Sequence, residues 1–315
     1  MIDLDDALLE RVRESYRAGL GRPVRRGRNL EQVYDTLQVL AMADRLPVKE
    51  ITTLGKATDP RERGLKAARN GQLEEGAGLI AESRRIYGSA RLSREAADYA
   101  ETFQTAAESY IEYRSGDYAA ADASMMRSLQ LCEDLANAFG DSFEMRRVHL
   151  ARNVARIRAF AGDRNQGLRI SAKLLQYIGS RESAWPLPYS GPPRRRLLPD
   201  DAAMFMLDQV LAEALRLLEP DAPAAIANLP AVAEARDLLL FGAPAFQRAA
   251  HCLSACIGYV ERDTRVFLEE SSDFFETGAQ SLELVWREME KKFLPADRAV
   301  GSQTMGTLAE IGFAK

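Results

Sequence analysis

Histidine is scarce in this chain, which limits the metal and acid–base chemistry that its sequence predicts. The two histidines are His149 and His251. Neither lies in an HExxH sequence or in a helical Glu-x-x-His pair. His251 begins the run HCLSAC, in which Cys252 and Cys256 lie one helical turn apart. That spacing suits a soft metal ion but supplies no fourth ligand, so we expect buried small residues there and no metal site.

Other signatures of catalysis are missing or weak. The sequence has no phosphate-binding GxxxxGK[ST], and GLGRPV at 19–24 has no third glycine. The segment DLDDALLE at 3–10 resembles the aspartate-rich metal box of all-helical terpene cyclases. Acidic residues at the start of a helix also complement its dipole, which is the simpler interpretation. We therefore expect no catalytic residues and no cofactor.

Arginine supplies the binding chemistry. Arg152 and Arg156 lie one helical turn apart, with Asn153 beside them. Guanidinium groups bind carboxylates through paired hydrogen bonds, so this group suits a carboxylate or an acidic peptide. The alternative is an ordinary solvated helix surface, on which these arginines pair with Glu144 and neighbouring acids.

Helices must position these residues. Apolar residues recur at spacings of three and four along the whole chain, and period-two alternation is almost absent. The sequence therefore predicts an all-α fold. The expected helices span 4–18, 30–44, 60–70, 73–87, 93–115, 117–138, 143–161, 164–179, 200–218, 222–240, 244–261 and 263–293, the last interrupted at Gly278.

Two segments interrupt the helical pattern. GLGRPVRRGRN at 19–29 cannot continue a helix past Pro23 and predicts a basic loop. SRESAWPLPYSGPPRRRLLPD at 180–200 contains prolines that favour an extended path. The predicted domains are an N-terminal helical segment (1–59), helical repeats (60–180), a Pro-rich loop (181–199), C-terminal helical hairpins (200–294) and a tail (295–315).

Three turn glycines recur at nearly constant spacing, at residues 71, 116 and 162. A small residue precedes each glycine by seven positions and another follows it by five. These pairs are Gly64 with Gly76, Ser109 with Ala121, and Ala155 with Gly167. Antiparallel helices joined by a tight turn approach closely only where facing residues lack bulk, and the turn needs positive φ. The pattern therefore predicts stacked helical hairpins, an α-solenoid.

The second copy, YIEYRSGDYAAADASMMRSL, resembles the tetratricopeptide-repeat (TPR) family. The residues that match the family's pattern are Ser109, Gly116, Asp117, Tyr118 and Ala121. The family's period is about 34 residues, its next small position is Ser128 here, and its closing proline is missing. Longer helices account for the wider spacing, and HEAT-like repeats share it. The resemblance covers residues 60–180 and implies a TPR-like solenoid with degenerate repeats.

The resemblance also implies a partner-binding site on the concave face, which the first helix of each hairpin forms. Counting back from the turn glycines, we expect seven residues on that face: Phe103, Tyr110, Tyr113, His149, Arg152, Asn153 and Arg156. The tyrosines would add rigid amphipathic contact area to the arginine group.

Composition excludes some functions. The formal net charge of -4 argues against a surface adapted as a whole to nucleic acid or anionic membranes. The acidic N-terminus does not resemble a secretory signal, and no stretch approaches the ~20 apolar residues of a membrane helix. Three cysteines form no even framework and fit a reducing compartment. We expect a cytoplasmic protein.

We predict a non-enzymatic helical-repeat protein, an adaptor, chaperone or regulator that binds a protein or peptide partner. Two alternatives stay open. LPVKEITTLGKAT at 46–58, taken as a helix-turn-helix, would make the chain a ligand-responsive transcription regulator. An all-helical enzyme would have its site between the repeats and residues 200–293, with Trp185 and Tyr189 on a lid.

The last helix carries an apolar stripe of Leu282, Val285, Met289 and Phe293. Such a stripe is typical of a terminal cap and also of a homodimer seam.

Overall fold

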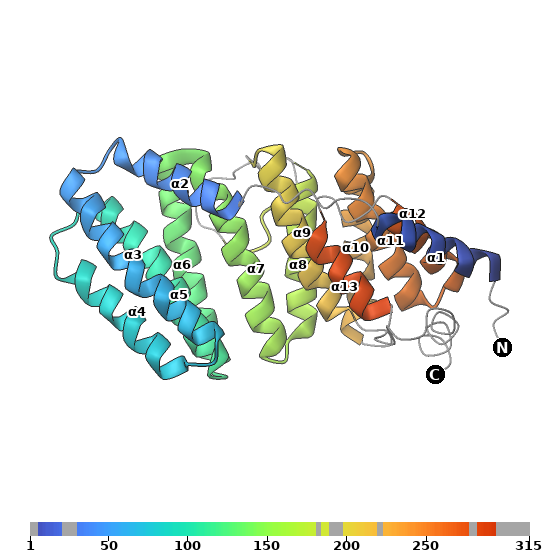
Figure 1. Cartoon of the computed structure of the whole chain (residues 1–315), viewed down its shortest axis with the longest axis horizontal. Helices are drawn as coiled ribbons and strands as arrows, with labels where there is room; N and C mark the ends of the chain where they lie inside the picture. The colour runs from blue at the N-terminus through green and yellow to red at the C-terminus, as the bar shows by residue number, and fades with distance from the viewer. Residues whose placement is uncertain are drawn as a thin grey trace. The chain divides into compact units, whose positions relative to one another are not determined.

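The computed structural model describes residues 6–20, 30–180, 184–188, 198–218, 223–276 and 282–293. These residues form α-helices and one short 3-10 helix, η1 (Gly140–Phe143), and contain no β-strand, so the all-α prediction is confirmed (Figure 1). The helices are α1 (Asp6–Leu20), α2 (Leu30–Ala43), α3 (Val48–Arg69), α4 (Leu73–Gly88), α5 (Arg94–Arg114), α6 (Tyr118–Phe139), α7 (Glu144–Phe160), α8 (Arg164–Gly179), α9 (Asp200–Leu217), α10 (Pro223–Leu240), α11 (Pro244–Glu261), α12 (Thr264–Glu276) and α13 (Glu283–Phe293).

The chain divides into two compact units. The hairpin unit is Asn29–Asp163 and contains α2 to α7. The composite unit joins Met1–Arg28 to Arg164–Lys315, so that α1 belongs with α8 to α13. The predicted segment 1–59 is therefore shared between both units, and its predicted end falls inside α3.

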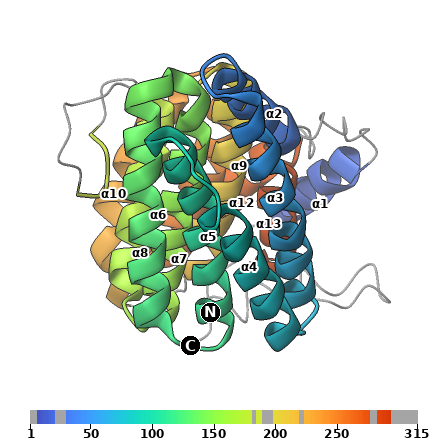
Figure 2. The same cartoon turned by 90° about the vertical axis from the view of Figure 1, so that its left-hand side faces the viewer.

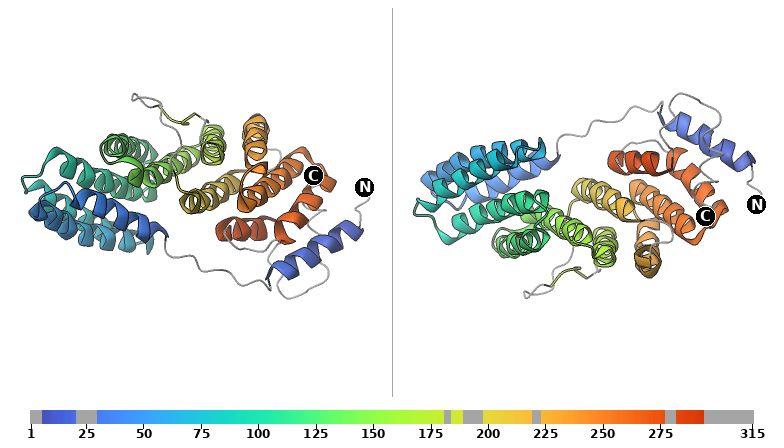
Figure 3. Two further views of the ribbon diagram at one scale, coloured as in Figure 1. Left: turned by 90° about the horizontal axis from the view of Figure 1, so that it is seen from above. Right: turned by 90° about the horizontal axis from the view of Figure 1, so that it is seen from below.

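Consecutive helices of the hairpin unit pack in pairs, α3 along α4 and α5 along α6. Figure 2 shows α5 with α3 and α4 to one side and α6 to the other, and α5 contacts all three. Figure 3 views the chain from above and from below, and in both views the α3–α4 pair lies next to the α5–α6 pair. Helix α7 packs against α6.

The turns of this unit follow the glycine pattern. Gly71, Gly116 and Gly162 have φ of 89°, 84° and 103°. In each turn the residue after the glycine donates its backbone N–H to the carbonyl five residues earlier, at 3.0 Å. This arrangement satisfies carbonyl groups that a helix end otherwise leaves open, and it requires a left-handed residue at the glycine.

The small residues predicted for the first two copies lie at close helix contacts. A Cβ on Gly64 would lie 2.8 Å from the carbonyl oxygen of Gly76, and the reverse holds for Gly76. In the next hairpin the Ser109 hydroxyl donates to the Ala121 carbonyl at 2.7 Å. The third copy runs past Asp163 into the other unit, so the hairpin unit contains only its first half.

Helix α3 differs from one of the open alternatives and from one predicted boundary. It is continuous from Val48 to Arg69, so residues 48–58 lie in one uninterrupted helix and contain no helix-turn-helix. Its start also precedes the predicted one at residue 60. Pro60 lies in the helix interior and is buried. Packing of Pro60 in the core outweighs the loss of one backbone hydrogen-bond donor.

The composite unit packs α8 on α9 and α10, α11 on α10 and α12, and α9 on α13. Helix α1 lies against α12 (Figure 1). Tyr16 stacks on Trp286 with ring centroids 5.7 Å apart. A Cβ on Gly19 would lie 2.5 Å from both the Phe275 carbonyl oxygen and the Trp286 ring. The N-terminal helix is thus tightly fitted to segments that lie 257 to 274 residues away in sequence, as the Ser15–Ser272 and Tyr16–Glu290 hydrogen bonds show.

The end of the chain follows the predicted pattern in part. The break predicted between the helices 244–261 and 263–293 is present, with Arg262 at φ 60° between α11 and α12. Leu282, Val285 and Met289 are buried within the composite unit, so these three side chains are not available to a second chain. The side chain of Phe293 is outside the described set.

Several predicted features fall wholly or largely outside the described residues: the basic loop beyond residue 20, most of the Pro-rich loop with Tyr189, the break between the predicted helices 200–218 and 222–240, Gly278 and the tail 295–315. Within the Pro-rich loop, Trp185 packs edge-on against Tyr177 with centroids 5.1 Å apart. None of the helices in the described ranges combines the length and apolar character needed to cross a bilayer.

Candidate functional site

Arginines gather around His149, which is half-buried on α7. Burial holds the pKa of His149 well below its usual range, and the positive charges of Arg152, Arg146, Arg156 and Arg69 lower it further. Both effects disfavour the imidazolium form. His149 is therefore neutral at pH 7 and lies in a positive field that two helices supply, α3 through Arg69 and α7 through the others.

The aromatic ring of Phe103 on α5 contacts two arginine side chains. The guanidinium carbon of Arg146 lies 4.2 Å from the ring centroid, and that of the buried Arg61 lies 5.1 Å from it. Both distances are within the range of cation–π attraction. One aromatic ring thus holds two cations from α3 and α7.

Helix periodicity explains why α7 can present these side chains together. Arg146, His149 and Arg156 are three and seven residues apart, so they lie on one face. Val148 and Ala155 on other sides of the helix are fully buried. We call the resulting surface the arginine face, comprising Arg61, Arg69, Phe103, Arg146, His149, Arg152 and Arg156.

Of the seven predicted partner-binding residues, the structure brings His149, Arg152 and Arg156 together, and Phe103 is linked to them through Arg146. Asn153 joins them, since its side-chain oxygen accepts a hydrogen bond from Arg152 at 3.1 Å.

The two tyrosines have other contacts. The Tyr110 hydroxyl accepts a hydrogen bond from Arg114 at 3.0 Å. Tyr113 packs near the hairpin turn, edge-on to Phe160 at 5.6 Å and beside Tyr118 at 5.9 Å. Neither contact ties these tyrosines to the arginine group.

Other arginines of α7 serve the packing of the hairpin unit. Arg158 binds Asp122 of α6 at 2.8 Å. Arg147 is buried and pairs with Glu144 at 3.1 Å and with Glu133 at 3.4 Å. Glu144, the acid that sequence analysis considers as a partner for Arg152 and Arg156, is thus part of this buried group.

Sequence reasoning missed Arg61, Arg69 and Arg146. The spacing of Arg146 from His149, three residues on one helix, was a readable signal. No sequence signal pointed to Arg61 and Arg69, because only the tertiary fold brings α3 close to α7.

The arginine face is equipped to bind an anion. The Arg146 Nε is buried and has no hydrogen-bond partner within the described residues. A buried donor without an acceptor costs about 1–3 kcal/mol, and an oxygen supplied by a ligand would recover part of it. The neutral His149 can donate or accept a hydrogen bond but brings no negative charge. Carboxylates and other oxyanions match this set of donors.

Potential metal ligands gather elsewhere. Among the residues that the structure describes, they meet in the composite unit at His251, Glu270 and Asp273. The cysteines of the HCLSAC run, Cys252 and Cys256, are buried.

Comparisons with known proteins do not place the chain in a family. No family model, no curated protein and no solved structure matches it. The function is therefore inferred from the geometry of the site.

Proposed function

We propose that the hairpin unit is a TPR-like helical-repeat module and that its arginine face binds an acidic segment of a protein partner. The protein then acts as an adaptor, chaperone or regulator and not through chemistry of its own. Arginines on a preformed helical surface bind the carboxylates of an extended or helical peptide, and Phe103 supplies apolar contact.

One observation carries this proposal: the positive charges that converge on His149. Arginines grouped in this way create a positive potential that attracts carboxylates. Arg146, stacked on Phe103 with a buried Nε that lacks an acceptor among the described residues, belongs to the same group. Such an arrangement is typical of a surface that receives an anionic partner.

Two further findings favour a repeat module as the scaffold. The turns at Gly71 and Gly116 share one backbone geometry, and each is flanked by a close contact between small residues. Helices α3 and α5 are the first helices of the pairs α3–α4 and α5–α6, and α7 follows α6 in the chain and packs against it. In a TPR-like stack these first helices line the concave surface.

An acidic peptide fits better than a nucleic acid. The chain has a net charge of -4, whereas protein surfaces that bind nucleic acids are broadly basic. The arginines here are confined to one face and are interleaved with Phe103 and His149, which suits side chains of a peptide.

The test is selection of peptides from a random library by the full-length protein, followed by fluorescence anisotropy with the selected peptides. We expect enrichment of Asp, Glu or a free C-terminal carboxylate. The double variant Arg152→Glu, Arg156→Glu should weaken binding at least tenfold, which corresponds to about 1.4 kcal/mol. The neutral double variant Arg152→Gln, Arg156→Gln should show a smaller loss.

A matched control reverses the same amount of charge in the other unit, at Arg265 and Arg287. Both are exposed and each pairs with a glutamate four residues away on its own helix. This control should bind as the wild type does, and circular dichroism should show all variants folded. Selection without acidic bias, or equal binding by the Arg152, Arg156 variants, would contradict the proposal.

A further inference from the structure

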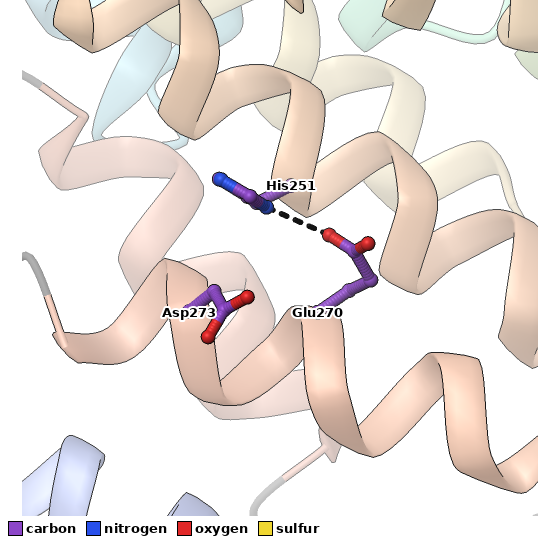
Figure 4. Close-up of side chains that lie close together, drawn as sticks. All are labelled: His251, Glu270 and Asp273. Carbon is purple, nitrogen blue, oxygen red and sulfur yellow. Dashed lines mark hydrogen bonds and ion pairs between the residues drawn. The ribbon is translucent and has the colours of Figure 1, made fainter.

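Three side chains with metal-binding chemistry converge in the composite unit. His251 lies on α11, and Glu270 and Asp273 lie three residues apart on α12 (Figure 4). One ligand atom from each lies within 4.8 Å of the other two. His251 Nδ1 is 2.7 Å from a Glu270 carboxylate oxygen. All three side chains are half-buried.

We propose that His251, Glu270 and Asp273 form a binding site for a divalent transition-metal ion of the Zn²⁺ class. The imidazole nitrogen and one oxygen from each carboxylate are the protein ligands, and water completes the coordination. This inference is independent of the arginine face, which lies in the hairpin unit.

The geometry is close to what such an ion requires. With metal–ligand bonds of about 2.1 Å, two ligands of one ion lie at most about 4.2 Å apart. The three ligand atoms therefore need only small side-chain rotations to meet one ion. Their backbones are held in place, because α11 and α12 pack along each other and α12 also packs against α1.

The donor set selects the kind of ion. One imidazole and two carboxylates suit Zn²⁺ and its first-row neighbours, whereas Mg²⁺ and Ca²⁺ prefer oxygen ligands alone. Three protein ligands with room for water are also the composition of open zinc sites, in contrast to closed structural sites with four protein ligands.

Charge around the cluster is compatible with a cation. The carboxylates of Glu270 and Asp273 lie close to His251. Arg11 of α1 forms an ion pair with Asp273 at 2.7 Å. Arg11 is about half exposed, with 52% of its side-chain surface accessible. It can therefore move into solvent at little cost when a divalent ion takes its place.

The experiment is isothermal titration calorimetry of ZnCl₂ into the full-length protein after treatment with a chelator. We expect one Zn²⁺ per chain, and no saturable heat from MgCl₂ under the same conditions. Glu270→Gln and His251→Gln each remove one ligand. Each should weaken the affinity for Zn²⁺ by roughly 100-fold, the upper end of the loss that follows mutation of a residue supporting a metal ligand. Wild-type protein should also unfold at a higher temperature with Zn²⁺ present, and Glu270→Gln should not.

Three control variants test which side chains hold the ion. Glu269→Gln removes the neighbouring acid, which pairs with Arg265, and should leave the affinity unchanged. Arg11→Gln removes the competing cation and should tighten binding a few-fold. Cys256→Ser tests the nearby thiols and should have no effect. The proposal is overturned if the wild type binds no Zn²⁺, if Glu270→Gln binds as tightly as the wild type, or if the cysteine variant alone loses binding.

Discussion

The guanidinium of Arg146 lies over the ring of Phe103, 4.2 Å from its centroid, and so links α7 to α5. This contact keeps a cation close to the four other arginines of the arginine face. It predicts an energetic coupling that a double-mutant cycle can measure. Combining Phe103→Leu with Arg146→Gln should give a coupling free energy of about 1 kcal/mol in denaturant unfolding. A coupling near zero would show that the two side chains are merely adjacent.

His149 should titrate abnormally. Its folded-state pKa lies below the ordinary value of 6.5, so the folded protein resists protonation more than the unfolded chain does. The contribution of His149 to stability is therefore complete above pH 6.5 and is lost as the pH falls towards the folded-state pKa. NMR titration should show a neutral ring at about pH 6, and His149→Gln should reduce the loss of stability in acid.

The same titration tests the proposed function. A bound acidic peptide would partly neutralise the arginines, so it should raise the pKa of His149. His251 serves as the internal reference, because its contact with Glu270 raises its pKa. A His149 signal that does not respond to saturating peptide would place the peptide away from the arginine face.

Glu133 should give the hairpin unit the opposite pH response. Burial raises its pKa to about 7, against the attraction of Arg147. The contribution of Glu133 to stability is complete below pH 4.5, its ordinary pKa, and is lost as the pH rises through about 7. Glu133→Gln should flatten the pH dependence of the free energy of unfolding between about pH 5 and 8. An unchanged slope would contradict this assignment.

The buried pairs of Arg147 should tolerate loss of one acid but not loss of the cation. Arg147→Met leaves the Glu133 and Glu144 carboxylates buried without that cation and should lower the free energy of unfolding by about 3–5 kcal/mol. Glu133→Gln should cost much less at neutral pH, since Glu144 still pairs with Arg147. Equal losses in the two variants would show that the pairs contribute mainly by packing.

Asp208 of α9 should act as a cap for α13. Its carboxylate accepts hydrogen bonds from the backbone N–H groups of Leu284 and Val285 at 3.1 and 2.9 Å, and burial raises its pKa to about 6. Asp208→Ala should destabilise the composite unit by about 1–2 kcal/mol. Asp208→Asn keeps an acceptor and should lose clearly less. Chemical denaturation of the three proteins provides the comparison.

Two glycines of α3 should respond in opposite directions to the same substitution. Gly64→Ala would place a Cβ 2.8 Å from the Gly76 carbonyl oxygen and should cost about 1–3 kcal/mol. Gly55→Ala meets nothing within 4 Å and should stabilise the helix by about 0.5–1 kcal/mol. Equal effects on thermal unfolding would refute the close approach of α3 and α4.

The local features of this protein can be predicted from short stretches of its sequence. Apolar spacing predicted an all-α fold, and Gly71, Gly116 and Gly162 marked turns that proved to share one geometry. These features depend on backbone dihedral angles and on neighbours within one or two helical turns, so nearby residues contain the information. The small residues Gly64 and Gly76 belong with them, since a tight turn of known length sets which positions face each other.

Which distant residues share a surface depends instead on the tertiary fold. Arg61 reached Phe103 and α1 joined the composite unit through packing between segments far apart in the chain, while the packing of α12 on α11 brought Glu270 and Asp273 to His251. Local preference was also overruled in α3, where the buried Pro60 lies inside a helix. The physical reason is common to all of these cases. Burial of apolar surface fixes how helices pack, and this contribution depends on every contacting segment at once, so no single stretch of sequence reveals it.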